Sequence, residues 1–368
     1  MTDRIISADD HIDLCYLPAD LWEKRLPTRW REQAPRVIDS PEGKIWFKEG
    51  KRWGVWGSKR PENRIVVYDK AGLPEEPEPG IWRCTSSKYR LEDLDREGIH
   101  ASVMYNFLDW AFVDQELKAA CCTAFNSWLA EELCAAAPGR LIGLATLPGH
   151  DPAAAVRELR RAKEIGLGGG FFEVFSAAIP IFDEAWDPLW CEAETLGMSI
   201  NVHTGAGGHT FAKIPSKKAW RFPTIAALGG IQLDEILTTA IYSGMLDRHP
   251  GLKFVLGEAG IGWIPFVLER LEYERDNFRD VAGGVPIKAE PREIFHRQVY
   301  ATFQDEKLGV RLIPEIGIGN VMWAADYPHG DGTFPHSQAV IARMFGDADP
   351  VLRRKVLWGN AAAVYGIT

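Results

Sequence analysis

A short stretch near the start of the chain gathers polar side chains that could do chemistry. The sequence "ADDHIDL" places Asp9, Asp10, His11 and Asp13 directly after the apolar run "RIISA". Burying carboxylates is costly unless they are paired or bind a cation, so this cluster needs a partner. Asp9 and His11 are two residues apart and share one face of an extended strand, whereas Asp10 faces the other side. Asp13 has the same parity as His11 and is a further possible ligand.

Three more such side chains follow apolar runs later in the chain: His203 in "NVHTGAGGH", Glu258 in "LGEAGIGW" and Asp326 in "WAADYPHGDG". In a parallel barrel, the carboxyl ends of the strands meet at one rim, where chemistry collects. Asp9, His11, His203 and Asp326 would then offer two carboxylates and two imidazoles. This donor set suits one divalent ion, zinc first, with manganese or iron as alternatives. Each residue alone is also ordinary turn chemistry, and only the joint pattern favours a metal site.

The elements that must position these residues alternate between short β-rich runs and helical patterns, which is typical of repeated βα units. A helix is expected at 151–166, where Asp151 suits the N-cap and Gly166 the C-cap. We predict an α/β fold, a (β/α)8 TIM barrel that forms a single domain over residues 1–368. The predicted strands cover residues 4–8, 101–107, 141–147, 169–175, 198–203, 253–258, 298–303 and 320–326.

Residues 36–90 interrupt this pattern. They contain alternating aromatic residues, frequent Gly and Pro, and no long amphipathic helix. We interpret them as a β-rich insertion after strand one that lies over the barrel mouth. Its tryptophans, Trp56 among them, either line a substrate pocket or form a local aromatic core.

Composition narrows the class of partner. The formal net charge of -9 makes nucleic acid an unsuitable partner, because phosphate binding needs concentrated Lys and Arg. The chain has no apolar run of membrane-spanning length and no signal-peptide pattern at its start, so we expect a cytoplasmic protein with no membrane partner. The six cysteines have no CxxC spacing, which indicates neither a zinc ribbon nor a disulfide framework. A small-molecule substrate is expected.

The order of "DxH" on strand one, "VH" on strand five, "ADYPH" on strand eight and a final "WGNAAAVYGI" resembles the amidohydrolase-related metal-dependent hydrolases. More narrowly, it resembles the branch that contains aminocarboxymuconate semialdehyde decarboxylase, the γ-resorcylate and 5-carboxyvanillate decarboxylases and several lactone hydrolases. The resemblance implies one divalent metal ion on Asp9, His11, His203 and Asp326, and a homo-oligomer, either a dimer or a tetramer. Asp-x-His is close to the Glu-x-His of the resorcylate-type enzymes, which favours a lyase. Glu258 in "GEAG" stands where these relatives place a His, which favours a hydrolase.

Two reactions therefore stay open, with a metal-bearing barrel that only binds a ligand as a remote third. In the first, Asp326 or Glu258 accepts a proton from an attacking water, and an amide, lactone or ketone bond of a small aromatic or cyclic substrate is hydrolysed. In the alternative, the same groups protonate the ring carbon of a phenolic or related acid that loses carbon dioxide without oxidation. Because of Glu258, hydrolysis is the main hypothesis. The residues expected to contact the substrate are Tyr105, Asn106, Trp56 and His329.

Overall fold

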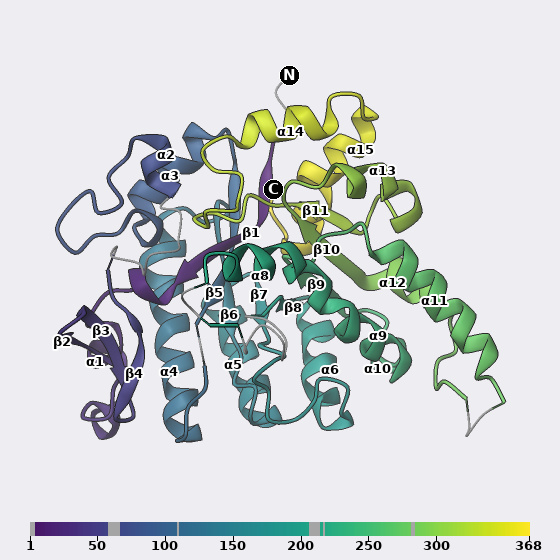
Figure 1. Ribbon diagram of the computed structural model, residues 1–368. Coiled ribbons are helices and arrows are strands. Elements are labelled where there is room, and N and C mark those ends of the chain that lie inside the picture. The colour runs from purple at the N-terminus through teal and green to yellow at the C-terminus, as the bar shows by residue number, and fades with distance from the viewer. Residues whose placement is uncertain (1–3, 58–66, 109, 206–213, 216–217, 281–283) are drawn as a thin grey trace.

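The computed structural model describes residues 4–57, 67–108, 110–205, 214–215, 218–280 and 284–368. Eight parallel strands form the central sheet, with bounds β1 (Ile6–Asp13), β5 (Ala101–Phe107), β6 (Leu141–Thr146), β7 (Gly169–Phe171), β8 (Ser199–His203), β9 (Lys253–Gly257), β10 (Val299–Phe303) and β11 (Val321–Trp323). They are hydrogen-bonded in chain order from β1 to β11, and the sheet curls into a nearly closed barrel (Figure 1). The predicted TIM barrel is confirmed.

Helices surround this sheet on its outer side (Figure 1). The α5 helix illustrates how the sequence fixes their ends: Asp151 accepts a hydrogen bond from the amide of Ala153, and Pro152 occupies the first turn. The helices are α1 (Leu21–Arg25), α2 (Val67–Ala71), α3 (Ser87–Arg96), α4 (Gln115–Trp128), α5 (Pro152–Glu164), α6 (Asp187–Leu196), α8 (Arg221–Gly229), α9 (Asp234–Tyr242), α10 (Met245–Arg248), α11 (Ile264–Asn277), α12 (Pro291–Gln298), α13 (Lys307–Ile316), α14 (Ser337–Phe345), α15 (Pro350–Arg354) and α16 (Asn360–Tyr365).

The barrel has two hydrophobic cores, because a parallel sheet buries both of its faces. The larger core lies between the strands and the surrounding helices. A smaller one fills the barrel interior, where Tyr105 and Phe171 pack with apolar side chains of the C-terminal helix α16. The hydroxyl of Tyr365 in α16 donates a hydrogen bond to Oδ1 of Asn201 at 2.9 Å. The helix α16 thus closes the barrel at the end opposite the carboxyl ends of the strands.

Residues 36–55 form a separate antiparallel sheet of β2 (Arg36–Ser40), β3 (Gly43–Lys48) and β4 (Lys51–Val55). Trp46 is fully buried there, with its ring centroid 5.0 Å from that of Trp22 and 6.4 Å from that of Trp53. Its indole N–H donates to the carbonyl of Leu14, just after β1, at 2.7 Å. Part of the tryptophan set is therefore a local aromatic core. That the whole segment 36–90 covers the barrel mouth stays a prediction, since residues 58–66 lie outside the described residues.

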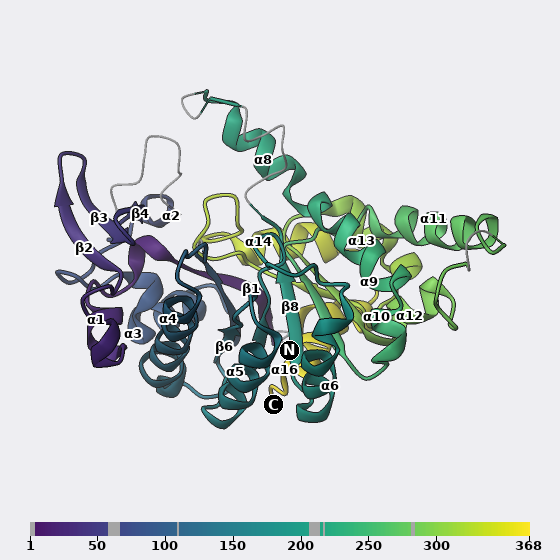
Figure 2. The ribbon, with the colours of Figure 1, turned by 90° about the horizontal axis from the view of Figure 1, so that it is seen from below.

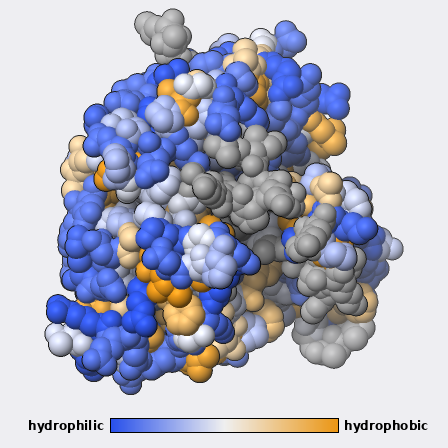
Figure 3. Space-filling model, turned by 60° about the vertical axis from the view of Figure 1, so that its left-hand side comes forward, coloured by the Kyte–Doolittle hydropathy of each residue, from blue (hydrophilic) through white to orange (hydrophobic). Residues whose placement is uncertain are grey.

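The surface mixes polar and apolar residues. On the face in Figure 3, hydrophobic residues lie in small patches among hydrophilic ones. The helix α8 projects away from the barrel (Figure 2). Within the described ranges, no helix combines the length and the apolar character needed to cross a bilayer.

Candidate active site

The acidic cluster lies within the first strand, because β1 continues beyond the predicted Ala8 as far as Asp13. A register shift between Ser7 and Asp10 interrupts its pairing with β5. Asp9, Asp10 and His11 are all fully buried. The carboxylate of Asp9 and the imidazole of His11 turn toward the barrel axis, whereas Asp10 contacts the opposite side of the strand, as its parity predicts.

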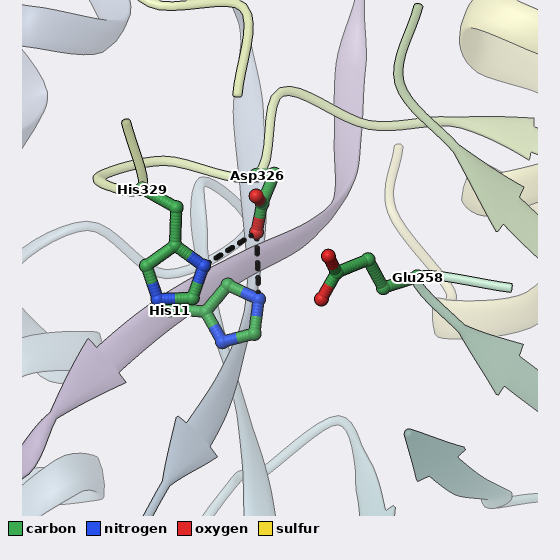
Figure 4. Close-up of side chains that lie close together, drawn as sticks. All are labelled: His11, Glu258, Asp326 and His329. Atoms are coloured by element: carbon green, nitrogen blue, oxygen red, sulfur yellow. Dashed lines mark hydrogen bonds and ion pairs between the residues drawn. The ribbon is translucent and has the colours of Figure 1, made fainter. Parts of the chain in front are cut away.

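The four predicted ligands come together although they come from three separate strand ends. Nε2 of His11 lies 3.5 Å from Oδ1 of Asp9 and 2.9 Å from Oδ1 of Asp326. Nε2 of His203, at the end of β8, lies 3.6 Å from the same Asp9 oxygen. Glu258, which follows β9, brings Oε2 to 3.4 Å from Nε2 of His203. Figure 4 shows Glu258 pointing toward the pair formed by His11 and Asp326.

Glu258 and Asp326 both have left-handed backbone conformations, with φ of 47° and 57°. Residues other than Gly are uncommon in this region, although Asp adopts it more readily than Glu, and such strain collects at functional sites. β9 ends at Gly257, directly before the left-handed Glu258, where the chain turns this carboxylate into the site. β11 ends at Trp323, three residues before Asp326, and so is shorter than the predicted 320–326 strand.

The two oxygens of Asp9 have different surroundings. Oδ2 accepts hydrogen bonds from the amide of Glu258 at 2.6 Å and from the hydroxyl of Thr302 at 2.7 Å. Oδ1 is buried and faces the imidazole Nε2 atoms of His11 and His203, at 3.5 and 3.6 Å. A buried carboxylate is costly unless a protonated imidazole or a metal cation neutralises its charge. One carboxylate oxygen and the imidazoles of His11 and His203 therefore fit a divalent ion, and their ligand atoms lie within 4.8 Å of one another.

A second, overlapping group of possible ligands consists of His11, Glu258, Asp326 and His329. His329 stacks on His11 with ring centroids 4.1 Å apart. Its Nδ1 lies 3.0 Å from Oδ1 of Asp326, and its Nε2 lies 3.2 Å from Oδ1 of Asp13. Both ring nitrogens thus face carboxylates. That His329 contacts the substrate stays a prediction. The carboxylate of Asp13, the further possible ligand, faces the imidazole of His329.

The charges of the site shift the pKa values of its members in opposite directions. Burial by itself would raise the pKa of Asp326, but His329 and the hydrogen bond from His11 hold it below its usual range. Burial and the nearby charge of Asp326 raise the pKa of Glu258. Burial would lower the pKa of His203, but the carboxylate of Asp9 raises it to about 9. Since a metal ligand must be deprotonated, ion uptake at His203 would release a proton.

The remaining predicted contacts are largely engaged within the protein. The hydroxyl of Tyr105 lies 3.4 Å from Oδ1 of Asn201, and its ring centroid lies 5.3 Å from that of His203, below the ligand cluster. Asn106 donates to the hydroxyl of Thr146 at 2.6 Å and accepts from the indole of Trp110 at 2.7 Å. Trp56 donates to the carbonyl of Leu17 at 2.9 Å and so borders the segment after β1. Substrate binding by these three residues stays a prediction.

Sequence reasoning missed two residues that shape the site. The hydroxyl of Thr302, in β10, accepts from the amide of Glu258 at 2.7 Å and donates to Asp9. The carboxylate of Glu306 accepts hydrogen bonds from the amides of Ile261 and Gly262 at 2.7 and 2.6 Å. These bonds hold the loop that follows Glu258. The position of Thr302 one residue before the end of a barrel strand was the available signal, but threonine is common in strands for other reasons.

Comparison with known proteins places the chain in a family. Residues 96–367 match the family model described as Amidohydrolase. The chain belongs to this family. The predicted resemblance to amidohydrolase-related enzymes is confirmed, and the protein is an enzyme of this superfamily.

Relatives within the family include decarboxylases. The chain is 33% identical over 218 residues to a gamma-resorcylate decarboxylase from Rhodococcus jostii (strain RHA1), a match that covers 55% of this chain and 64% of that enzyme. It thus spans just under two thirds of that relative.

Two solved structures show the shared fold. An amidohydrolase from Mycobacterium avium subsp. paratuberculosis has a TM-score of 0.78 at 19% identity, over 100% of this chain and 99% of that one. A dihydroxybenzoic acid decarboxylase from Polaromonas sp. JS666, solved with bound manganese and the inhibitor 2-nitroresorcinol, has a TM-score of 0.67 at 19% identity, over 99% and 97% of the two chains.

Proposed function

We propose that the protein is a metal-dependent decarboxylase that removes the carboxyl group of a small phenolic acid as carbon dioxide. The observation that carries the proposal is the cluster of Asp9, His11, His203 and Asp326 in a chain 33% identical to a gamma-resorcylate decarboxylase. The sequence alone favoured hydrolysis because of Glu258. The comparisons support the alternative reaction better, and decarboxylation becomes the main hypothesis.

We assign the metal-holding role to one oxygen of Asp9, to Nε2 of His11 and of His203, and to Asp326. The two carboxylates and two imidazoles fit manganese, zinc or iron, and we favour manganese because carboxylate ligands suit it and because the Polaromonas structure contains it. When bound, a divalent cation supplies a Lewis acid for the carboxylate and hydroxyl oxygens of such a substrate. The feature of this chain that best supports an ion is the buried group of Asp9, His11 and His203, whose ligand atoms all lie within 4.8 Å of one another.

Asp326 and Glu258, the two residues with left-handed backbones, have different roles in this proposal. Oδ1 of Asp326 faces imidazole nitrogens of His11 and His329, and its side chain is only 2% exposed. The side chain of Glu258 is 22% exposed, and its carboxylate points toward His11 and Asp326 (Figure 4). We therefore assign the proton-donor role to Glu258. Its raised pKa favours a protonated carboxyl group, which a proton donor needs.

The proposed reaction balances without an oxidant or an external nucleophile. Glu258 donates its proton to the ring carbon that bears the carboxylate, and a carbon–hydrogen bond forms. The bond from that carbon to the carboxylate breaks, and its electron pair restores the aromatic ring. Carbon dioxide leaves, and Glu258 regains a proton from solvent.

Hydrolysis remains the second candidate, because Glu258 occupies the position where the resemblance places a His. A carboxylate there could accept a proton from an attacking water. The deciding experiment supplies manganese-loaded protein with a panel of 2-hydroxybenzoic acids, and in parallel with aryl lactones and amides in ¹⁸O-labelled water. We expect the 2-hydroxybenzoic acids to give carbon dioxide and a phenol in equal amounts, with no ¹⁸O in the phenol. Turnover of lactones or amides with ¹⁸O incorporation would overturn the proposal.

A ligand-binding barrel without catalysis would bind the ion and turn over neither panel. The cytoplasmic location and the dimeric or tetrameric state stay predictions, which cell fractionation and sedimentation would test.

A further inference from the structure

The outer side of β1 carries a second carboxylate that the proposed reaction does not use. Asp10 is fully buried. Its Oδ1 accepts hydrogen bonds from the hydroxyl of Ser7 at 2.7 Å and from the amide of Tyr327 at 3.1 Å. Its Oδ2 accepts from the hydroxyl of Ser102 and lies 3.7 Å from Nη2 of Arg90. A buried carboxylate with this many partners is held in one orientation.

Arg90, in α3, compensates the charge of Asp10 and is itself fully buried. Its Nη1 donates to the carbonyl of His11 at 3.0 Å and to that of Cys84 at 2.9 Å, and its Nη2 donates to Ser102 at 3.2 Å. Arg90 therefore fixes the backbone of β1 at His11, whose imidazole is a proposed metal ligand. Buried ion pairs add little net stability, so their value is often that they specify one geometry.

The same network reaches the turn that carries Asp326. The amide of Ala325 donates to the hydroxyl of Ser7 at 2.8 Å, and the amide of Tyr327 donates to Asp10. The amides on both sides of Asp326 are thus held by two side chains of β1. Between them, Asp326 has its left-handed backbone, a conformation that persists only where the surroundings fix it.

We propose that Asp10, together with Ser7, is a positioning residue that holds the left-handed turn at Asp326, and thereby sets where this carboxylate meets His11. The manganese-affinity and activity readouts below rest on the proposed function, whereas amide exchange in this turn does not.

The test measures amide hydrogen exchange of the segment 324–328 in four variants. Asp10→Ala removes the acceptor of the Tyr327 amide, and Asp10→Asn retains an oxygen that can accept it. Ser7→Ala removes the acceptor of the Ala325 amide and keeps Arg90 and Asp10 paired. Ser102→Ala is the matched control, because this buried hydroxyl contacts the other oxygen of Asp10 and does not touch the turn.

We expect exchange in 324–328 to become about 10-fold faster or more in Asp10→Ala and in Ser7→Ala, since each leaves an amide without its acceptor. Asp10→Asn should restore most of the protection, and Ser102→Ala should leave it within about twofold of the wild-type rate. Manganese affinity, measured by electron paramagnetic resonance, should fall by about 10- to 100-fold in Asp10→Ala and Ser7→Ala, as for other outer partners of metal ligands. Wherever there is turnover, kcat should fall more than KM rises.

Unchanged exchange in Ser7→Ala, or equal acceleration in Ser102→Ala, would overturn the proposal. Asp10→Ala leaves Arg90 without its counter-charge and can fail to fold, in which case Ser7→Ala and its control decide. If the wild-type protein bound no ion, the proposed function would fail, and the exchange measurement would still decide the role of Asp10.

Discussion

The substitution Asp9→Asn tests the proposed metal site, because the structure dictates which way the new amide must face. In the wild-type protein, Oδ2 accepts from the amide of Glu258 and from the hydroxyl of Thr302, at 2.6 and 2.7 Å. An asparagine keeps both bonds only if its oxygen takes the Oδ2 position. Its NH2 group then takes the position of Oδ1, 3.5 Å from Nε2 of His11. That group has no lone pair to offer a cation.

Two magnitudes follow from this orientation. The hydrogen bonds at Oδ2 are retained, but the carboxylate charge that raises the pKa of His203 to about 9 is lost. Without metal, the free energy of unfolding should therefore fall by up to about 3 kcal/mol near neutral pH, and by less as the pH rises above the pKa of His203. Losing a direct ligand should weaken metal binding by at least the roughly 100-fold that losing an outer partner costs, which is about 2.8 kcal/mol. The variant is thus expected to fold normally and to lose its ion.

The assay titrates manganese into metal-stripped wild-type and variant protein by isothermal calorimetry, with bound metal counted by mass spectrometry and unfolding followed by circular dichroism. An Asp9→Asn protein that keeps one ion per chain with an affinity within about threefold of wild type would refute the assignment. A variant that unfolds cooperatively as before but binds no ion would support it.

Three further changes test other parts of the site. Glu258→Gln should retain the ion and lower kcat by about 10²- to 10⁴-fold, and wild-type-like turnover would remove Glu258 from the chemistry. Thr302→Val should lower metal affinity by about 10-fold or more, while Thr302→Ser, which keeps the hydroxyl, should match wild type in the same titration. Dialysis against a chelator should abolish turnover, and manganese at about 100 times its Kd should restore it and stabilise the fold by about 2.7 kcal/mol in thermal unfolding; restored activity without added metal would contradict this.

The barrel was predictable from the sequence because its signals are local. Apolar β-rich runs stand out one by one, and five of them, such as 101–107 and 253–258, agree with observed strands to within one residue at each end. The convergence of Asp9, His11, His203 and Asp326 was also predictable, since strand order in a parallel barrel places every carboxyl end at one rim.

The parts that were not predicted depend on distant partners. The first strand continues past Ala8 because Arg90 and Ser102 satisfy Asp10 and Asp326 faces His11, and no pattern within β1 reveals these residues. The predicted 320–326 strand includes Asp326, whose left-handed backbone is held by side chains from the other end of the chain. The role of Thr302 depends on Asp9, so only the folded structure brings it to light.

The line along which the first and last parts of the barrel meet passes through the candidate active site. The amide of His11 donates to the carbonyl of Tyr327 at 2.6 Å, and the amide of Asp326 donates to the carbonyl of Asp9 at 3.0 Å, which joins the first and last strands of the sheet. A cation bound by Asp9, His11 and Asp326 would link the first strand to the segment after the last strand and so stabilise the closed barrel. Residues 321–327 must be synthesised before these contacts can form, so a chain truncated before them would lack both the closure of the barrel and one of the proposed metal ligands, Asp326.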